Sequence, residues 1–130
     1  MLDLSVIILA RNEELHIRRC LENILPVVKE VFVIDCFSTD NTAAICREYP
    51  RVQVIQHEWP GLYALQFNWA LDNCPITAEW VLSLDADEWF MPEALEELKA
   101  KLPALPPDVT GIIHKRRHIF LGRWMKHGVY

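Results

Sequence analysis

The chain has 130 residues, 52% of them hydrophobic, which is enough to build the core of one domain and requires no second domain. Its formal net charge of -5 excludes a protein that binds nucleic acid through a general basic field. Four widely spaced cysteines without a C-x-x-C pair, and no signal pattern after Met1, predict reduced thiols in a cytoplasmic protein.

The first part of the chain predicts a strand, a helix and a second strand. Residues 4–10 form a compact apolar run typical of a buried strand, and Asn12 follows as a candidate helix N-cap. Apolar residues at helical spacing then continue until Pro26, where we expect the helix to end. Residues 31–35 are the second predicted strand.

The same alternation continues through the middle of the chain. Asp40 is expected to cap a helix over residues 41–49, and residues 52–56 form the third predicted strand. After a Pro-Gly loop, residues 62–73 are a third predicted helix and residues 79–84 a fourth strand.

Beyond these elements, Pro92 suits the first turn of a fourth helix, which prolines end after Leu102. Residues 111–120 are predicted to be extended, with His114, Arg116 and His118 on one face.

Successive strand-helix units imply right-handed crossovers and a mostly parallel sheet with helices on both faces, which is a Rossmann-like α/β fold. Neither G-x-G-x-x-G after the first strand nor a P-loop is present, so a phosphorylated ligand must be held in another way.

The fourth strand runs directly into Asp85, Asp87 and Glu88. Open α/β sheets bind ligands where their strands end, and clustered carboxylates repel one another unless a cation lies among them. Oxygen ligands favour hard divalent ions, so this segment predicts a Mg²⁺ or Mn²⁺ site for a phosphorylated ligand. The alternative is an acidic turn that caps the helix beginning near Pro92.

Four segments, taken in order, resemble the family 2 glycosyltransferases of the GT-A fold. They are S-V-I-I-L-A-R-N-E-E at residues 5–14, V-I-D-C-F-S-T-D-N-T at 33–42, N-W-A-L at 68–71, and W-V-L-S-L-D-A-D-E at 80–88. The tail, including Gly122, His127 and Gly128, is similar to bacterial members that build lipopolysaccharide cores or surface glycans. The resemblance implies that residues 1–130 are a single nucleotide-sugar-binding GT-A domain, truncated before the acceptor-binding part.

This resemblance implies transfer of a sugar from a nucleotide-diphosphate donor, with a UDP-sugar as the first choice, to a hydroxyl of a glycan or lipid-linked acceptor. Inversion at the anomeric carbon and a Mg²⁺ or Mn²⁺ cofactor are expected, in a cytoplasmic protein that can associate peripherally with the inner membrane. The family's catalytic base lies in the later part, and nothing after Asp108 is acidic, so the catalytic residue is unknown.

Site residues are carried over from the family by position. Asp87 matches the residue that ligates the cation, and Asp85 the one that faces the ribose or the metal's water shell, so both are predicted metal ligands. Asp35 matches the residue that reads the nucleobase or ribose, although a turn role is equally open. The donor-binding residues implied are Ala10, Arg11, Asn12, Glu13, Asp35, Gln66, Asp85, Ala86 and Asp87.

The chain departs from the family at Cys36-Phe37, where relatives carry an acid or small residue followed by glycine, and at Phe67, where they often carry a basic residue. Residues 115–117, all basic, are either a phosphate clamp or a solvated edge. Trp89 is a candidate for the sugar pocket and His127 for the acceptor side.

Two rival functions remain open from the sequence. One is a nucleotide-sugar-binding module without turnover. The other is a nucleotidyltransferase, which lacks support because residues 10–14 are neither glycine-rich nor strongly basic.

Overall fold

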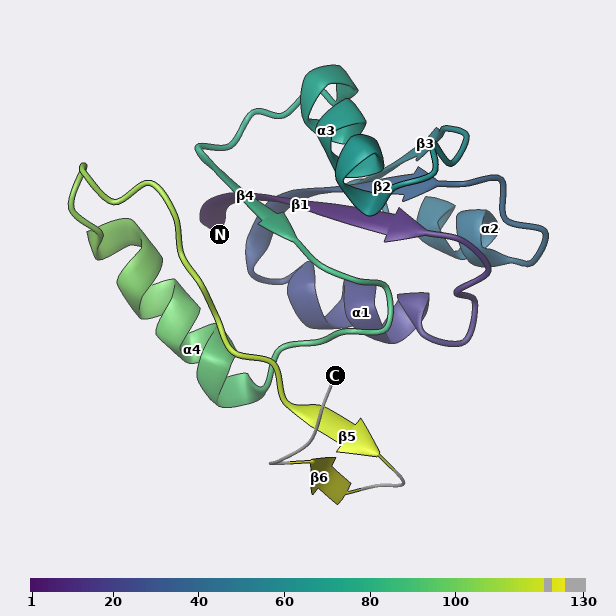
Figure 1. Cartoon of the computed structure of the whole chain (residues 1–130). Helices are drawn as coiled ribbons and strands as arrows, with labels where there is room; N and C mark the ends of the chain where they lie inside the picture. The colour runs from purple at the N-terminus through teal and green to yellow at the C-terminus, as the bar shows by residue number, and fades with distance from the viewer. Residues whose placement is uncertain (121–122, 126–130) are drawn as a thin grey trace.

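The computed structural model describes residues 1–120 and 123–125, which form a four-stranded parallel sheet in the order β3-β2-β1-β4 and a two-stranded antiparallel ribbon (Figure 1). The predicted parallel α/β architecture is confirmed. The sheet strands are β1 (Leu2–Ala10), β2 (Val28–Asp35), β3 (Val52–Gln56) and β4 (Trp80–Ser83), and the ribbon consists of β5 (His118–Phe120) and β6 (Arg123–Met125). The helices are α1 (Ile17–Ile24), α2 (Thr42–Arg47), α3 (Tyr63–Asn73) and α4 (Pro92–Lys101), followed by the 3-10 turn η1 (Leu102–Ala104).

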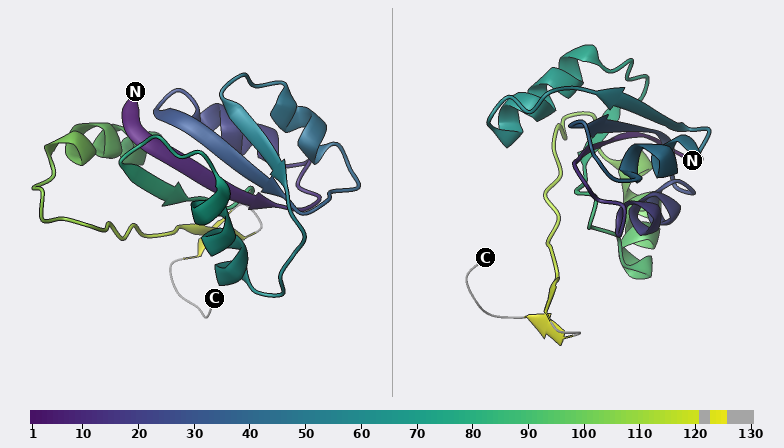
Figure 2. Two further views of the ribbon diagram at one scale, coloured as in Figure 1. Left: turned by 90° about the horizontal axis from the view of Figure 1, so that it is seen from above. Right: turned by 90° about the vertical axis from the view of Figure 1, so that its right-hand side faces the viewer.

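Helices cover both faces of the sheet, as predicted, but unevenly. Alternate residues of β1 point to opposite faces, so Val6 and Ile8 enter a large core with residues of α1, α2 and α4, whereas Ile7 enters a smaller core with α3. Figure 2 shows α3 alone on its side of the sheet. The central strands β1 and β2 are buried on both faces, which explains their continuous apolar sequence.

The predicted start of the first helix is wrong. Asn12 has a φ of 52° in the left-handed region and does not cap α1, which begins at Ile17. Between them, the carbonyl of Glu13 accepts hydrogen bonds from the N–H groups of His16 (3.0 Å) and Ile17 (2.9 Å) in a separate turn. The N-cap of α2 is Asn41 and not the predicted Asp40, which accepts the N–H of Thr42 at 2.9 Å from the position before it.

The predicted extended segment is only partly a strand, because β5 begins at His118 and residues 111–117 have no regular secondary structure. Gly122, His127, Gly128 and Tyr130 lie outside the described residues. None of the described helices is long and apolar enough to cross a bilayer.

Glu30 ties together three parts of the chain at the amino-terminal side of the sheet. One of its carboxylate oxygens accepts hydrogen bonds from Ser5 of β1 (2.6 Å) and from the backbone N–H (2.7 Å) and hydroxyl (3.0 Å) of Thr77, just before β4. Partial burial raises the pKa of Glu30, but these hydrogen bonds outweigh it and hold the pKa below its ordinary value.

Glu30→Gln should therefore destabilise the fold at pH 7 by about 1–2 kcal/mol, since a charge-assisted hydrogen bond is lost. A carboxyl group with a depressed folded-state pKa adds stability above its unfolded pKa and loses it as the pH falls through the folded pKa. The difference in unfolding free energy between the variant and wild type should thus disappear on acidification below about pH 4, as measured by urea unfolding. Glu79→Gln, which changes an exposed carboxylate, is the matched control. A difference in unfolding free energy that is equally large at pH 7 and below about pH 4 would contradict this role of Glu30.

Candidate functional site

The predicted site residues converge on one edge of the sheet because they follow three neighbouring parallel strands. Ala10 ends β1 beside Asp35, which ends β2, and the carbonyl of Ala10 accepts the N–H of Cys36 at 2.9 Å. On the other side of β1, the N–H of Leu84 donates to the carbonyl of Ile7 at 3.1 Å. The segment beginning at Asp85 therefore leaves the sheet at the same edge (Figure 1).

Residues 85–88 form a compact turn, which we name the acid turn. The N–H of Asp85 donates to a carboxylate oxygen of Glu88 at 2.8 Å, and the N–H of Glu88 donates to the carbonyl of Asp85 at 2.9 Å. Ala86 is 3% exposed and belongs to the large core, whereas Asp87 is exposed. The small apolar residue thus anchors the turn, and the neighbouring acids lie toward solvent.

Helix α1 holds the backbone of this segment through three side chains. Cys20 Sγ contacts the carbonyl of Asp85 at 3.7 Å, and Arg19 Nη2 donates to the carbonyl of Asp87 at 3.4 Å. Asn23 makes a reciprocal pair with the backbone of Phe90, donating to its carbonyl at 3.0 Å and accepting its N–H at 2.7 Å. Sequence reasoning missed Arg19 and Asn23. Their only signal is that two polar residues four apart flank the apolar stripe of the helix.

Trp89 is 40% exposed, and the guanidinium carbon of Arg19 lies 4.0 Å from the centre of its ring. This cation–π contact covers part of the indole and fixes its orientation. Stacking of Trp89 on a sugar stays a prediction, and it requires indole surface that Arg19 does not cover.

Tyr63, at the start of α3, is a further residue that the sequence did not reveal. Its hydroxyl lies 2.8 Å from Ser83 Oγ and donates to Asp85 at 3.4 Å. Burial raises the pKa of Tyr63, with Asp85 adding to the effect, so the phenol stays protonated and can donate to the carboxylate.

The carboxylates at this edge crowd one another. Burial raises the pKa of Glu13, and the negative charges of Asp87, Asp40 and Asp85 add to the rise. An added cation would relieve this repulsion.

A hard divalent cation fits the groups present. The Asp87 carboxylate is exposed and accepts no hydrogen bond from any described residue, and Asp85 contributes oxygen atoms from the same turn. Within the described part of the chain, no group of three or more His, Cys, Asp or Glu side chains is placed to hold a metal ion. Asp85 and Asp87 could therefore supply only part of a coordination shell, and bound ligand and water would complete it.

Asp35 has the turn role that the sequence left open. It is fully buried, and its two carboxylate oxygens accept the Ser38 N–H at 3.1 Å and the Ser38 hydroxyl at 2.5 Å. Gln56 donates to the same carboxylate at 3.3 Å. A contact from Asp35 to a nucleobase or ribose stays a prediction.

The loops after β1 and β2 also bond to each other, in left-handed conformations. Asn12 donates its backbone N–H to Ser38 Oγ at 2.9 Å and accepts the N–H of Thr39 at 2.8 Å. Phe37 has a φ of 49°, in the left-handed region that favours glycine, and the residue is 51% exposed. The site edge therefore contains a strained, exposed aromatic residue.

Gln66 lies deeper than its predicted donor-binding role requires. It is 1% exposed, its Oε1 lies 2.6 Å from His57 Nδ1, and its Nε2 donates to the His57 carbonyl at 3.3 Å. His57 in turn stacks on Trp69, with ring centres 3.7 Å apart. Contact between Gln66 and a donor stays a prediction, and its described bonds order the loop after β3.

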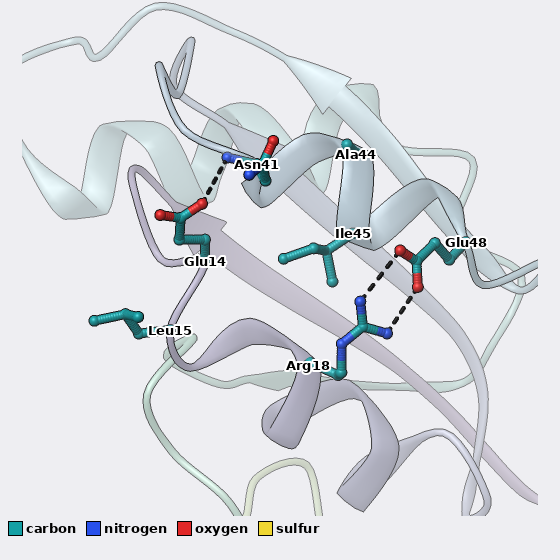
Figure 3. A pocket seen from close by; sticks show the side chains of 7 residues that line it. All are labelled: Glu14, Leu15, Arg18, Asn41, Ala44, Ile45 and Glu48. Carbon is teal, nitrogen blue, oxygen red and sulfur yellow. Dashed lines mark hydrogen bonds and ion pairs between the residues drawn. The ribbon is translucent and has the colours of Figure 1, made fainter.

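A hollow of about 470 Å³ lies elsewhere, between the start of α1 and α2 (Figure 3). The guanidinium of Arg18 spans it to both carboxylate oxygens of Glu48, at 2.7 and 3.1 Å. None of the predicted donor-binding residues lines this hollow, which we therefore do not assign to the site. Its lining consists of Glu14, Leu15, Arg18, Asn41, Ala44, Ile45 and Glu48.

Comparison with known proteins gives a consistent result. The family described as glycosyl transferase family 2 matches residues 5–129. The chain is 34% identical over 125 residues to the lipopolysaccharide core biosynthesis glycosyltransferase LpsC of Rhizobium meliloti, covering 93% of this chain and 44% of that protein. It is also 34% identical over 96 residues to an uncharacterized glycosyltransferase of Rickettsia felis, covering 74% of this chain and 32% of that protein. The chain thus spans less than half the length of these curated relatives.

Two solved structures share the fold. TarS residues 1–349 of S. aureus superpose with a TM-score of 0.65 and 25% identity, over 88% of this chain and 39% of that one. Glucosyl-3-phosphoglycerate synthase of Mycobacterium tuberculosis, solved with Mn²⁺, UDP and glucosyl-3-phosphoglycerate, gives a TM-score of 0.52 at 23% identity. This second match covers 64% of this chain and 33% of the synthase. Both matches agree with the predicted GT-A architecture.

The contacts from α1 to the backbone of residues 85–90 lead to a test of how this segment is held. Asn23→Ala removes both hydrogen bonds to Phe90 and should lower stability by about 1–2 kcal/mol. Hydrogen exchange of the Phe90 amide should become faster, because its acceptor is gone. Asn73→Ala, whose amide donates only within α3 at 2.8 Å to Trp69, is the control. Unchanged exchange at Phe90 would show that the core alone holds the segment.

Proposed function

The chain belongs to glycosyl transferase family 2, and on that premise we propose that it forms the donor-binding part of an enzyme that transfers a sugar from a nucleotide diphosphate to an acceptor hydroxyl. The observation that carries the proposal is the convergence of the loops after β1, β2 and β4 at one sheet edge, with the acid turn among them. UDP-sugar is the proposed donor class, and the synthase that shares this fold was solved with UDP.

We assign the donor's parts to this edge as follows. The segment from Ala10 to Glu13 receives the base and ribose through polar groups that can bond to ring N–H groups and hydroxyls, and for Asp35 to take part its buried carboxylate must exchange its bonds to Ser38 and Gln56. Ala86 acts through its backbone, since its methyl group is buried in the core. Gln66 supports the site from below through His57.

A Mg²⁺ or Mn²⁺ ion is the proposed cofactor, with Asp87 as the main protein ligand and Asp85 beside it. When bound, such an ion stabilises the negative charge that develops on a departing nucleoside diphosphate. The residues of this chain hold the turn in place, keep the Tyr63 phenol protonated beside Asp85, and present carboxylate oxygens to the ligand.

Bacterial glycan synthesis, with lipopolysaccharide core as the first case, is the proposed pathway, in keeping with the similarity to LpsC. Inversion at the anomeric carbon, a cytoplasmic location and peripheral association with the inner membrane are parts of the same proposal. The acceptor is a glycan or a lipid-linked hydroxyl compound.

A second candidate is donor binding without turnover by these 130 residues. It is favoured by one observation, because no carboxylate side chain follows Asp108 that could activate an acceptor. This candidate predicts that UDP-sugar binds to the chain but is neither hydrolysed nor transferred.

The proposal predicts that Mn²⁺ strengthens UDP binding and that Asp87→Asn removes most of this gain, about tenfold or more in Kd, because a charged oxygen ligand is lost. Isothermal titration with UDP, with and without Mn²⁺, measures both effects. Asp108→Asn, an exposed carboxylate after η1, is the control with the same change in charge. UDP binding that is indifferent to both Mn²⁺ and Asp87 would refute the cation site, and release of free sugar from UDP-sugar would reject the module without turnover.

A further inference from the structure

The segment after η1 returns to the acid turn and places a positive charge on it. Arg116 Nε lies 2.8 Å from Glu88 Oε2, and Arg116 Nη2 lies 3.7 Å from Asp85 Oδ2. Two residues earlier, the ring of His114 packs against Phe90, with centres 5.7 Å apart. His114 and Arg116 thus lie on the same side of this segment, as the predicted alternation requires, with His114 against Phe90 and Arg116 against the acid turn. Figure 1 shows this segment running back past the start of α4 before it reaches β5.

The ion pairs between Arg116 and the acid turn are weak enough to be exchanged for another cation. The side chain of Arg116 is 58% exposed and those of its partners Asp85 and Glu88 are 42% and 25% exposed, so water and salt reach both pairs and screen the Asp85 pair more. Exposed ion pairs of this kind change an equilibrium constant by about fivefold at most. A divalent ion carries twice the charge of a guanidinium and binds carboxylate oxygen directly, so it competes well for Asp85, the carboxylate that both Arg116 and the proposed cation site use.

We propose that Arg116 is the counter-ion of the acid turn in the ligand-free protein and that a divalent cation displaces it. The inference rests on the cation site proposed above and adds a residue to it. In the ligand-free protein, Arg116 is paired with two of these acids and so offsets part of their mutual repulsion.

Displacement has a second effect, because Arg116 stays tethered to the site edge by the neighbouring segment. A guanidinium released from two carboxylates has its forked donors free for another anion, and a diphosphate offers oxygens in matching geometry. The cation and the diphosphate would then both favour the released arrangement of Arg116. Each therefore strengthens binding of the other through this side chain.

The neighbouring residue supplies a matched control. Lys115 carries the same charge one position away but makes none of the contacts that Arg116 makes with the acid turn. Lys115→Gln thus tests the effect of net charge alone, and Arg116→Gln tests charge and contact together. Arg116→Lys keeps the charge and removes the fork that reaches two carboxylates. All three changes are at exposed positions, so the fold should tolerate them.

The deciding experiment titrates Mn²⁺ alone into the 130-residue chain at low ionic strength, with free Mn²⁺ measured by electron paramagnetic resonance. Arg116→Gln should bind Mn²⁺ about three- to fivefold more tightly than wild type, and Lys115→Gln less than twofold more tightly, with Arg116→Lys between them. A second titration, with UDP in the absence of metal, should show the opposite effect, because Arg116→Gln should bind UDP more weakly than wild type does.

Equal or weaker Mn²⁺ binding by Arg116→Gln would overturn the inference while leaving the cation site in place. An equal increase in Mn²⁺ affinity for Lys115→Gln would also overturn the inference, because the effect would then come from net charge rather than from the contact of Arg116 with the acid turn. If neither wild type nor any variant binds Mn²⁺, the proposed cation site fails, and the displacement of Arg116 fails with it.

Discussion

Mutual repulsion among carboxylates is the constraint on which this site depends. Burial raises the pKa of Glu13, and Asp87 and Asp85 are held close enough for their charges to add to the rise. Such an arrangement persists only if other interactions hold the backbone. Here they are the burial of Ala86 in the core and the side-chain bonds from α1 to the carbonyls and amides of residues 85–90. The backbone of residues 85–90 is therefore anchored by several contacts at the place where its carboxylates repel one another.

The parallel sheet explains why these acids meet loops from distant parts of the sequence. Because β1 lies between β2 and β4, the loops that follow all three strands leave from the same edge. The loops after β1 and β2 are further joined through Asn12, Ser38 and Thr39. These bonds hold the left-handed residue Asn12 against the loop after β2, so the site has one half built on β1 and β2 and an acidic half after β4.

Periodic patterns and turn residues predicted most of the fold, and the bounds of β3 agree with the prediction residue for residue. The start of α1 was mispredicted because Asn12 is as suitable for a left-handed turn as for a helix cap, and the choice depends on its bond to Thr39, which is remote in sequence. The residue types of the acid turn were visible in the sequence. The support from Arg19, Asn23 and Tyr63 was not, because contacts between side chains and distant segments leave no periodic signal.

Cys20 lies under the acid turn, and the reactivity of its thiol reports on whether the surrounding structure is closed. Its sulfur lies beneath the carbonyl of Asp85, and burial raises the pKa of the thiol to about 12. Thiolate, not thiol, reacts with alkylating reagents and oxidants, so this cysteine is inert while the turn is closed. Because Cys20 is fully buried, a reagent reaches it only when the structure around it opens. The rate of its alkylation would therefore report such openings, including any that move residues 85–88 away from α1, and a ligand that stabilises this region would protect a sulfur atom it never touches.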